Sequence, residues 1–302
     1  MPTKFSSNTK GILFIVSAIF CLSLMDGFTR YLTDYYNVIT INMFRYFFLF
    51  LFVITINSIG NKSVIFVSKS NYKKIQIIRG TILAIEMCFA HYLFLKIGLI
   101  ETHAIFASCP LIVAALSVFF LGEKIYIYRT LALILGFSGM LVIIRPGFVD
   151  ISIGVYMVLF SALLWSINII ITKKISKDDS AITILAYQSI FMSILSFFIV
   201  LFFWETPSLK SFIYLVLSAI CGTVLHLTLN HAFKLVDVSM TQPYSFLNLV
   251  FASIIGYLVF DEMPDLYTWI GALIIFTGVL IISYREMKLD KDIIRKRVDI
   301  KS

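Results

Sequence analysis

Long continuous stretches of apolar residues dominate the chain, and short polar segments separate them. A bilayer core about 30 Å thick is crossed by about 20 residues of α-helix. The apolar residues run on without alternating, which favours helices over a transmembrane barrel. We therefore predict an all-α integral membrane protein with ten transmembrane helices. The ten stretches cover residues 11–31, 38–58, 76–96, 101–121, 126–144, 152–172, 181–204, 211–232, 238–260 and 266–284.

The composition supports this class. Of the 302 residues, 60% are hydrophobic and 14% are charged, whereas a soluble domain is about half apolar and about a quarter charged. The first stretch, from Gly11, is longer than the apolar core of a signal peptide, and no small-residue cleavage site follows it. We expect it to be retained as a helix. The four cysteines lie in apolar stretches without disulfide or metal spacing and are interpreted as small buried hydrophobic residues. We expect no cofactor and no metal.

Basic residues predict the orientation of the helices. If the N-terminus is cytoplasmic, 20 of the 25 Lys and Arg residues lie in inner segments or in the C-terminal tail. Four lie on the outer side, at Arg30, Lys96, Arg145 and Lys210, and Arg45 lies within a helix. This bias satisfies the positive-inside rule. We expect a multi-pass protein of the cell inner (cytoplasmic) membrane with both termini cytoplasmic. The net charge of +8 then reflects membrane topology and no nucleic-acid partner.

The two halves of the chain repeat one pattern. A shift of 143 residues aligns the stretch from Gly11 with that from Gly154 without a gap, and a shift of 139 aligns Glu123 with Glu262. Each unit has five helices, an odd number, so the second copy is predicted to be inverted in the membrane. Two inverted five-helix repeats are typical of alternating-access carriers, whose site lies near the midplane between the halves. The predicted units are residues 1–147, residues 148–284 and a basic cytoplasmic tail, residues 285–302.

Several motifs resemble a known family along nearly the whole chain. They are LGEK at 121–124, FDEMPD at 260–265, the pair Asp26 and Arg30, Arg45, Arg79–Gly80, and TQPYSFLNLVFASIIGYLVFDEMPD from Thr241. This set is similar to EamA-type members of the drug/metabolite transporter superfamily. The resemblance implies a carrier for a small organic metabolite. Members include amino-acid exporters, nucleotide-sugar carriers and an uptake system for S-adenosylmethionine. Asp26, Arg45, Arg79 and FDEMPD resemble the branch of the superfamily that includes the S-adenosylmethionine carrier.

Asp26 and Arg45 are ionisable residues inside predicted helices, where charge is costly. Arg45 lies about seven residues, or roughly 10 Å, from the outer end of its helix, and Asp26 lies roughly 8 Å from the outer end of its own. The similar depth allows a buried ion pair. Arg45 could bind a substrate carboxylate, either directly or after it exchanges Asp26 for the substrate. The alternative is a permanent structural pair between Asp26 and Arg45. The second half has Ile169 and Gln188 at the equivalent positions, which predicts an asymmetric site.

Glu86 lies near the centre of the third predicted helix. Burial favours the neutral form of a carboxyl group, so Glu86 could bind a coupling proton or pair with a cationic substrate. A protonated side chain that only joins two helices is the alternative. His91 is a second coupling candidate, but five residues separate it from Glu86, and a relay between them does not fit one helix face.

Other polar side chains extend the candidate substrate site. His226 and Asn230 are four residues apart and share a helix face, whereas His226 and His231 do not have metal-ligand spacing. An aromatic ring beside an amide suits a flat or amphipathic solute, and ordinary hydrogen bonding between helices is the alternative for each residue. The remaining candidates are Trp165, Asn168, Gln188, Tyr244 and Asn248.

These features predict a secondary transporter and not an enzyme. We expect it to move a small organic metabolite, an amino acid or an amino-acid-derived or nucleoside-like solute, by alternating access with proton coupling or exchange. S-adenosylmethionine uptake is the alternative within the superfamily, and a membrane-embedded lipid-modifying enzyme is the alternative from another class. The acidic pair Asp178–Asp179 has no His or further carboxylate nearby in sequence, and no GxxxxGK[ST] loop occurs. The expected partners are the substrate and the lipid bilayer, with the protein a monomer or homodimer.

Overall fold

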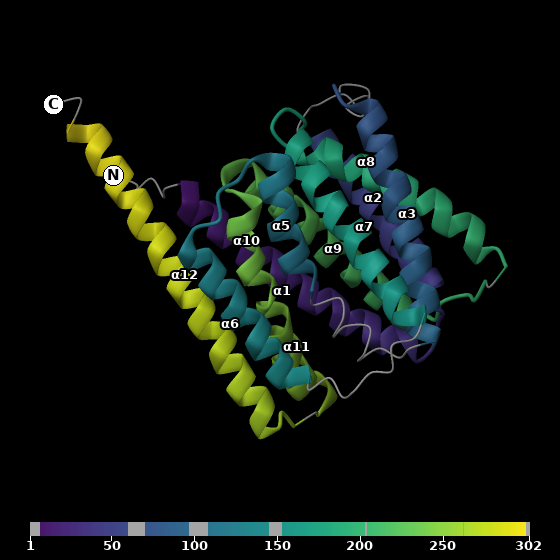
Figure 1. Ribbon diagram of the computed structural model, residues 1–302. Coiled ribbons are helices and arrows are strands. Elements are labelled where there is room, and N and C mark those ends of the chain that lie inside the picture. The colour runs from purple at the N-terminus through teal and green to yellow at the C-terminus, as the bar shows by residue number, and fades with distance from the viewer. Residues whose placement is uncertain are drawn as a thin grey trace.

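The computed structural model describes residues 7–59, 70–96, 108–144, 153–202, 204–261 and 263–299. All regular secondary structure in these ranges is helical (Figure 1). The helices are α1 (Ser7–Thr33), α2 (Val38–Ile59), α3 (Lys73–Lys96), α5 (Cys109–Leu121), α6 (Ile127–Ile144), α7 (Ile153–Ile175), α8 (Ala181–Val200), α9 (Leu209–Leu235), α10 (Val238–Ser245), α11 (Leu247–Phe260) and α12 (Leu266–Asp299).

Seven segments of the described residues are long and apolar enough to cross a membrane. Two shorter apolar helices, Cys109–Leu121 and Ile127–Ile143, accompany them. Large apolar side chains such as Phe119 (82% exposed) and Leu273 (70% exposed) point outward, as expected for a protein whose solvent is lipid. This confirms a multi-pass membrane protein. Ten crossings stay a prediction, and part of the fourth predicted stretch, residues 101–107, lies outside the described residues.

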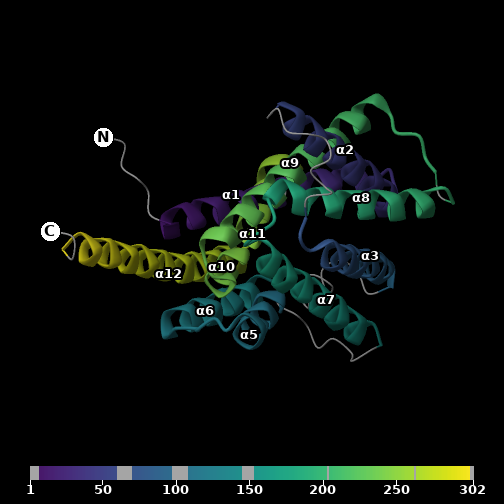
Figure 2. The same ribbon diagram turned by 90° about the horizontal axis from the view of Figure 1, so that it is seen from above.

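The helices pack in matching pairs. α1 packs against α9 just as α7 packs against α3, and α2 contacts α9 just as α8 contacts α3. α1 also contacts α11, and α7 contacts α5, while α6 and α12 pack together along one edge of the molecule (Figures 1 and 2). The same pattern of contacts results when α1, α2 and α3 are replaced by α7, α8 and α9, respectively, and α7, α8 and α9 by α1, α2 and α3. Two structural repeats would produce this pattern.

Close packing between α6 and α12 depends on two glycines. A Cβ atom on Gly139 would lie 2.7 Å from the carbonyl oxygen of Gly271, and one on Gly271 would lie 2.5 Å from that of Gly139. Real Cβ atoms do not approach a backbone so closely, so neither position accepts a side chain without moving a helix. Small residues at such contacts are common between membrane helices.

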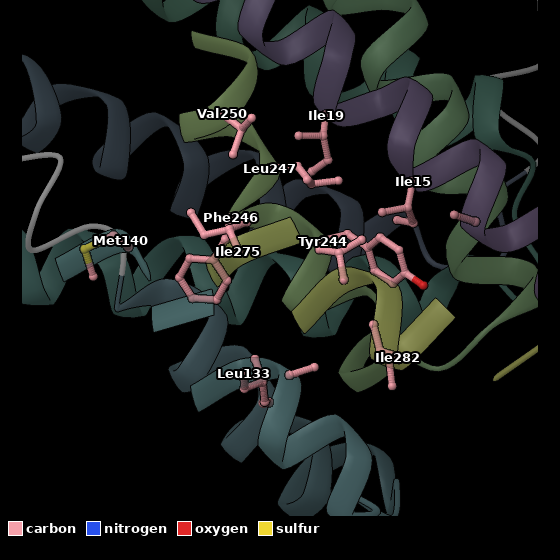
Figure 3. Packing of buried hydrophobic residues seen from close by; sticks show 14 residues of the cluster. Ile15, Ile19, Leu133, Met140, Tyr244, Phe246, Leu247, Val250, Ile275 and Ile282 are labelled. Carbon is pink, nitrogen blue, oxygen red and sulfur yellow. The ribbon is translucent and has the colours of Figure 1, made fainter. Parts of the chain in front are cut away.

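The ninth predicted stretch divides into α10 and α11 at Phe246. Pro243 lies inside α10, and its missing N–H removes one helical hydrogen bond. Figure 3 shows Tyr244, Phe246 and Val250 of this segment in the largest apolar cluster, together with side chains of α1, α6 and α12 such as Ile15 and Ile282. The kink therefore turns the two halves of the stretch toward one core.

α12 extends beyond its predicted end at residue 284 and continues to Asp299. The stretch predicted to cross the membrane ends at residue 284, so the described part of the predicted polar tail continues the same helix. Glu286 explains the extension, because its carboxylate accepts a hydrogen bond from Arg129 Nε over 2.9 Å and is only 4% exposed. The start of the tail is thereby held against α6.

Candidate functional site

A small cavity lies between α3, α7, α8 and α9, which neighbour one another in Figure 2. It admits water and is below the roughly 300–1,000 Å³ of pockets that hold small organic ligands. Five predicted site residues line it, namely Trp165, Asn168, Gln188, His226 and Asn230. The other lining residues are Arg79, Ile169, Thr172, Leu229 and Phe233. The helices thus bring together amides, an imidazole and an indole from three separate stretches of sequence.

Polar groups around the cavity differ in how well they are satisfied. Gln188 Nε2 lies 3.2 Å from His226 Nε2, and Asn230 Nδ2 donates to the carbonyl of Ala181 over 3.5 Å. Asn168 is 6% exposed, and its Oδ1 has no hydrogen-bond partner among the described residues. A buried polar atom without a partner is costly, so Asn168 retains an acceptor for a further group.

Arg79 is the charged residue of the cavity, and it is absent from the predicted site. Its side chain is 1% exposed; Nη1 donates to Thr172 Oγ1 over 3.1 Å, and Nη2 donates to the carbonyl of Ile184 over 2.6 Å. Nε has no partner among the described residues. The predicted stretch begins at residue 76, which puts Arg79 only three residues from its cytoplasmic end, among the inner basic residues. α3 in fact begins at Lys73, which places Arg79 almost two turns inside.

Arg45 is 9% exposed and lies apart from this cavity. Its Nε donates to Ser218 Oγ over 3.1 Å, Nη1 donates to Asn42 Oδ1 over 3.0 Å, and Nη2 donates to Thr29 Oγ1. All three nitrogens therefore have neutral acceptors. Across the described residues, no ion pair joins Arg45 to Asp26, although the two charges are close enough to act on each other.

Asp26 and Asn248 form a separate polar contact between α1 and α11. Asn248 Nδ2 donates to Asp26 Oδ2 over 3.4 Å, and Asn248 Oδ1 accepts from Ser23 Oγ over 2.6 Å. The structure therefore joins Asp26 to Asn248 and leaves Arg45 with hydroxyl and amide partners.

The remaining predicted residues lie elsewhere. Glu86 is 9% exposed in α3, and Ser161 Oγ of α7 donates to its Oε1 over 3.2 Å. Tyr244 is 1% exposed in the apolar cluster, and its hydroxyl lies 2.8 Å from Ser283 Oγ of α12. The side chain of His91 lies outside the described residues. Glu86 thus shares the α3–α7 contact with Arg79, whereas Tyr244 faces a different neighbour.

Charged residues join the halves at the predicted cytoplasmic ends of the helices. Arg129 Nη1 lies 3.0 Å from Asp237 Oδ2, and its Nε pairs with Glu286. The carboxylate of Glu123 accepts two backbone N–H groups at the start of α10, each over 2.8 Å. This negative charge at a helix N-terminus is stabilising. We interpret these residues as structural contacts around the site.

A second set of contacts ties the start of α3 to the connection between α7 and α8. Asp179 Oδ2 accepts hydrogen bonds from Ser70 Oγ over 2.6 Å and from Gln76 Nε2 over 2.9 Å. The Tyr72 hydroxyl donates to Asp178 Oδ2 over 2.6 Å. This hydrogen bond and the negative charge raise the pKa of Tyr72, so its phenol remains a donor at neutral pH.

Comparisons with known proteins place these features in a family. The model of the EamA-like transporter family matches residues 9–145 and 152–284. The chain belongs to the EamA-like transporter family. A protein of known crystal structure superposes on this EamA-like chain with a TM-score of 0.79 at 14% identity, over 94% of this chain and 98% of the other. At that identity the likeness shows the fold alone.

Curated relatives of the EamA-like chain are transporters. An S-adenosylmethionine uptake transporter of Rickettsia conorii is 30% identical over 92% of this chain and 94% of its own length. One of Rickettsia prowazekii is 28% identical over 95% of this chain and 97% of its own. A riboflavin transporter of Vibrio cholerae is 27% identical over 61% of this chain and 62% of its own. Transport of small molecules is therefore common to these relatives.

Proposed function

We propose that this protein is a secondary transporter that moves an amino-acid-derived or nucleoside-like metabolite across the cytoplasmic membrane by alternating access. The observation that carries the proposal is the polar cavity between α3, α7, α8 and α9. The five uncharged polar side chains and the buried arginine that line it are expensive inside a membrane bundle. Intramembrane sites of this composition bind solutes or ions in carriers, and the family membership agrees with that use.

The extent of the similarities favours S-adenosylmethionine, or a solute like it, as the substrate. The S-adenosylmethionine uptake transporters match 92% or more of this chain, whereas the Vibrio cholerae riboflavin transporter matches 61%. Trp165 beside Asn168 and Gln188 provides an aromatic face with amide groups, which suits the flat base of a nucleoside. Riboflavin, also flat, is the second solute to test.

The small cavity also supports a moving carrier. Because the space admits water and no organic solute, the surrounding helices must separate before substrate enters. We infer rocking of two inverted repeats about this region, a motion supported by the exchangeable pattern of helix contacts. Glu86, buried on the α3–α7 contact, is our candidate for a coupling proton, with exchange of solutes as the other source of drive.

Counterflow into proteoliposomes tests the proposal. Purified protein is reconstituted with internal unlabelled S-adenosylmethionine, methionine or riboflavin, and entry of the labelled compound is followed. Saturable counterflow of S-adenosylmethionine is expected. Flux that rises linearly with concentration indicates a channel, product formation without flux indicates an enzyme, and absence of counterflow for all three compounds refutes the proposal.

A further inference from the structure

Arg45 and Arg79 have matching surroundings on opposite sides of the predicted membrane. Arg45 lies near the predicted outer start of α2, and its Nη2 donates to Thr29 of α1. Arg79 lies near the predicted cytoplasmic start of α3, and its Nη1 donates to Thr172 of α7. Thr29 and Thr172 correspond under the 143-residue shift that aligns the two halves. Each arginine is thus fixed by the same threonine of the repeat.

The two threonines are also held in the same way. Thr29 Oγ1 donates to the carbonyl of Met25, and Thr172 Oγ1 donates to the carbonyl of Asn168, each over 2.7 Å. Met25 and Asn168 correspond under the same shift. Because each hydroxyl proton is used one turn back along the helix, the oxygen lone pairs are available to a guanidinium group.

The position equivalent to each arginine in the second half of the chain lies beside the other arginine. Under the 143-residue shift Arg45 aligns with Gln188, which lines the cavity together with Arg79. Under the 139-residue shift Arg79 aligns with Ser218, whose hydroxyl accepts from Arg45 Nε over 3.1 Å. Each arginine therefore lies near the counterpart of the other, although neither recurs as arginine in the second half.

Both guanidinium groups lack a bound carboxylate in the part of the chain that the structure describes. Their partners are hydroxyl, amide and carbonyl oxygens. Asp179 acts electrostatically on Arg79, but its Oδ2 accepts from Ser70 and Gln76. A buried charge is stable only when it is paired and hydrogen-bonded, so an anionic group from outside the chain would complete each site.

The free atoms at the cavity define the chemistry of that group. Arg79 Nε is a donor and Asn168 Oδ1 an acceptor, both buried at the cavity and without partners among the described residues. The planar arginine fork matches a carboxylate, and the amide oxygen accepts from an ammonium group. A carboxylate and an ammonium attached to the same carbon atom are the α-amino-acid group.

We infer that Arg79 and Asn168 form a cytoplasmic-side binding site for the α-amino-acid group of the substrate, and that Arg45 with Thr29 forms the corresponding carboxylate site on the outer side. The substrate carboxylate is held by Arg45 in one half of the transport cycle and by Arg79 in the other. This inference rests on the proposed transport function and adds the class of group recognised and the residues that recognise it on each side.

Sided membrane vesicles test the two sites separately. Exchange of labelled S-adenosylmethionine is measured in right-side-out and inside-out vesicles, with the opposite side saturated. Arg79→Lys removes the planar fork and is expected to raise the half-saturation concentration on the cytoplasmic face about 10-fold or more, with little change on the outer face. Arg45→Lys should give the reverse. Asn168→Leu should follow Arg79→Lys.

Decarboxylated S-adenosylmethionine provides the ligand control. It should compete poorly on both faces of the wild type, and each lysine variant should lose discrimination against it on its own face. Equal effects of Arg79→Lys on the two faces, or equal competition by the decarboxylated compound, overturn the inference while leaving transport established. Saturable counterflow of riboflavin without S-adenosylmethionine also overturns it, since riboflavin carries no carboxylate. Absence of counterflow for all compounds overturns both proposals.

Arg129→Lys is the matched control, because Arg129 is also a buried arginine but is paired with Asp237 and Glu286. It should alter the two faces equally, if at all. Thermal unfolding in detergent accompanies every variant, so that a folding defect is separated from loss of binding.

Discussion

The two arginine sites share a plan but differ in how completely they are satisfied. Every guanidinium nitrogen of Arg45 donates to a neutral acceptor, whereas Nε of Arg79 has no partner among the described residues and the side chain borders a cavity. The protein's own acceptors therefore occupy every nitrogen of Arg45, whereas Arg79 still has a hydrogen-bond donor available at Nε. In this conformation the predicted cytoplasmic site is the one prepared to receive a ligand.

The difference also separates binding from stability. Three acceptors on three helices surround Arg45, so this arginine holds α1, α2 and α9 together. Arg79 is incompletely bonded, and a buried charge without its full set of partners destabilises a fold. A buried charged residue that carries such a cost is a functional candidate. The following variants test how far the two sites differ, in order of decreasing expected effect.

Neutralising the two arginines should give the largest contrast. Arg79→Gln is expected to lower S-adenosylmethionine counterflow roughly 100-fold or more, because a charged hydrogen-bonding partner of the substrate is lost. It should lower thermal stability less than Arg45→Gln does, because Arg79 has two hydrogen-bond acceptors and Arg45 has three. Arg45→Gln should also impair transport but destabilise the protein by about 1–3 kcal/mol, since it leaves buried acceptors unpaired. Counterflow and the unfolding temperature in detergent are measured together. A stability loss in Arg79→Gln matching that of Arg45→Gln would contradict the contrast.

A substitution of Glu86 tests whether its carboxyl group, at the contact between α3 and α7, couples protons to transport without being needed for substrate binding. Glu86→Gln keeps the shape and the hydrogen bond from Ser161 but cannot exchange a proton. We expect loss of pH-driven accumulation with exchange retained at more than about half of the wild-type rate, since the amide preserves the contact. Uptake is measured with and without an imposed pH gradient. Unchanged pH-driven uptake would remove Glu86 from the coupling role.

Sequence patterns predict most of this fold because a spanning helix is encoded locally, by about 20 apolar residues in a row. They fail where distant contacts decide. The continuation of α12 depends on the bond between Glu286 and Arg129, far apart in the chain. The division of the ninth stretch at Phe246 follows a recognisable proline, Pro243, but its position depends on packing against α6 and α12.

The candidate site was predictable in part for the same reason. Trp165, Asn168 and Gln188 stand out as polar or aromatic groups deep in apolar helices, and they line the cavity. Tyr244 stands out equally but faces Ser283, because spacing along a helix shows which residues share a face and not which helix that face meets. Arg79 was missed because α3 starts at Lys73, earlier than the apolar pattern suggests.

The two threonines provide a matched pair of smaller changes. Thr29→Val and Thr172→Val each remove one acceptor from an arginine at corresponding positions of the two halves. A typical hydrogen bond contributes about 1 kcal/mol, so we expect roughly fivefold weaker exchange in each variant. The loss should appear on the outer face for Thr29→Val and on the cytoplasmic face for Thr172→Val, measured in the sided vesicles described above. The same face affected by both variants would show that the sites do not correspond.

The smallest effect is expected for the surface contact between Tyr72 and Asp178, which ties α3 to the connection after α7. Tyr72→Phe removes this exposed hydrogen bond but leaves Gln76 and Asp179 in place. Exposed polar contacts are weak, so exchange should change less than about twofold. Because the pKa of Tyr72 is raised, the neutral phenol is favoured in the folded protein, and the contribution of this contact is present below the ordinary tyrosine pKa and lost only in strong alkali. Exchange rates of wild type and variant should therefore keep a constant ratio between pH 6 and about 9. A ratio that shifts within this range would mean that other groups control the start of α3, and that the cytoplasmic arginine site is more mobile than its contacts indicate.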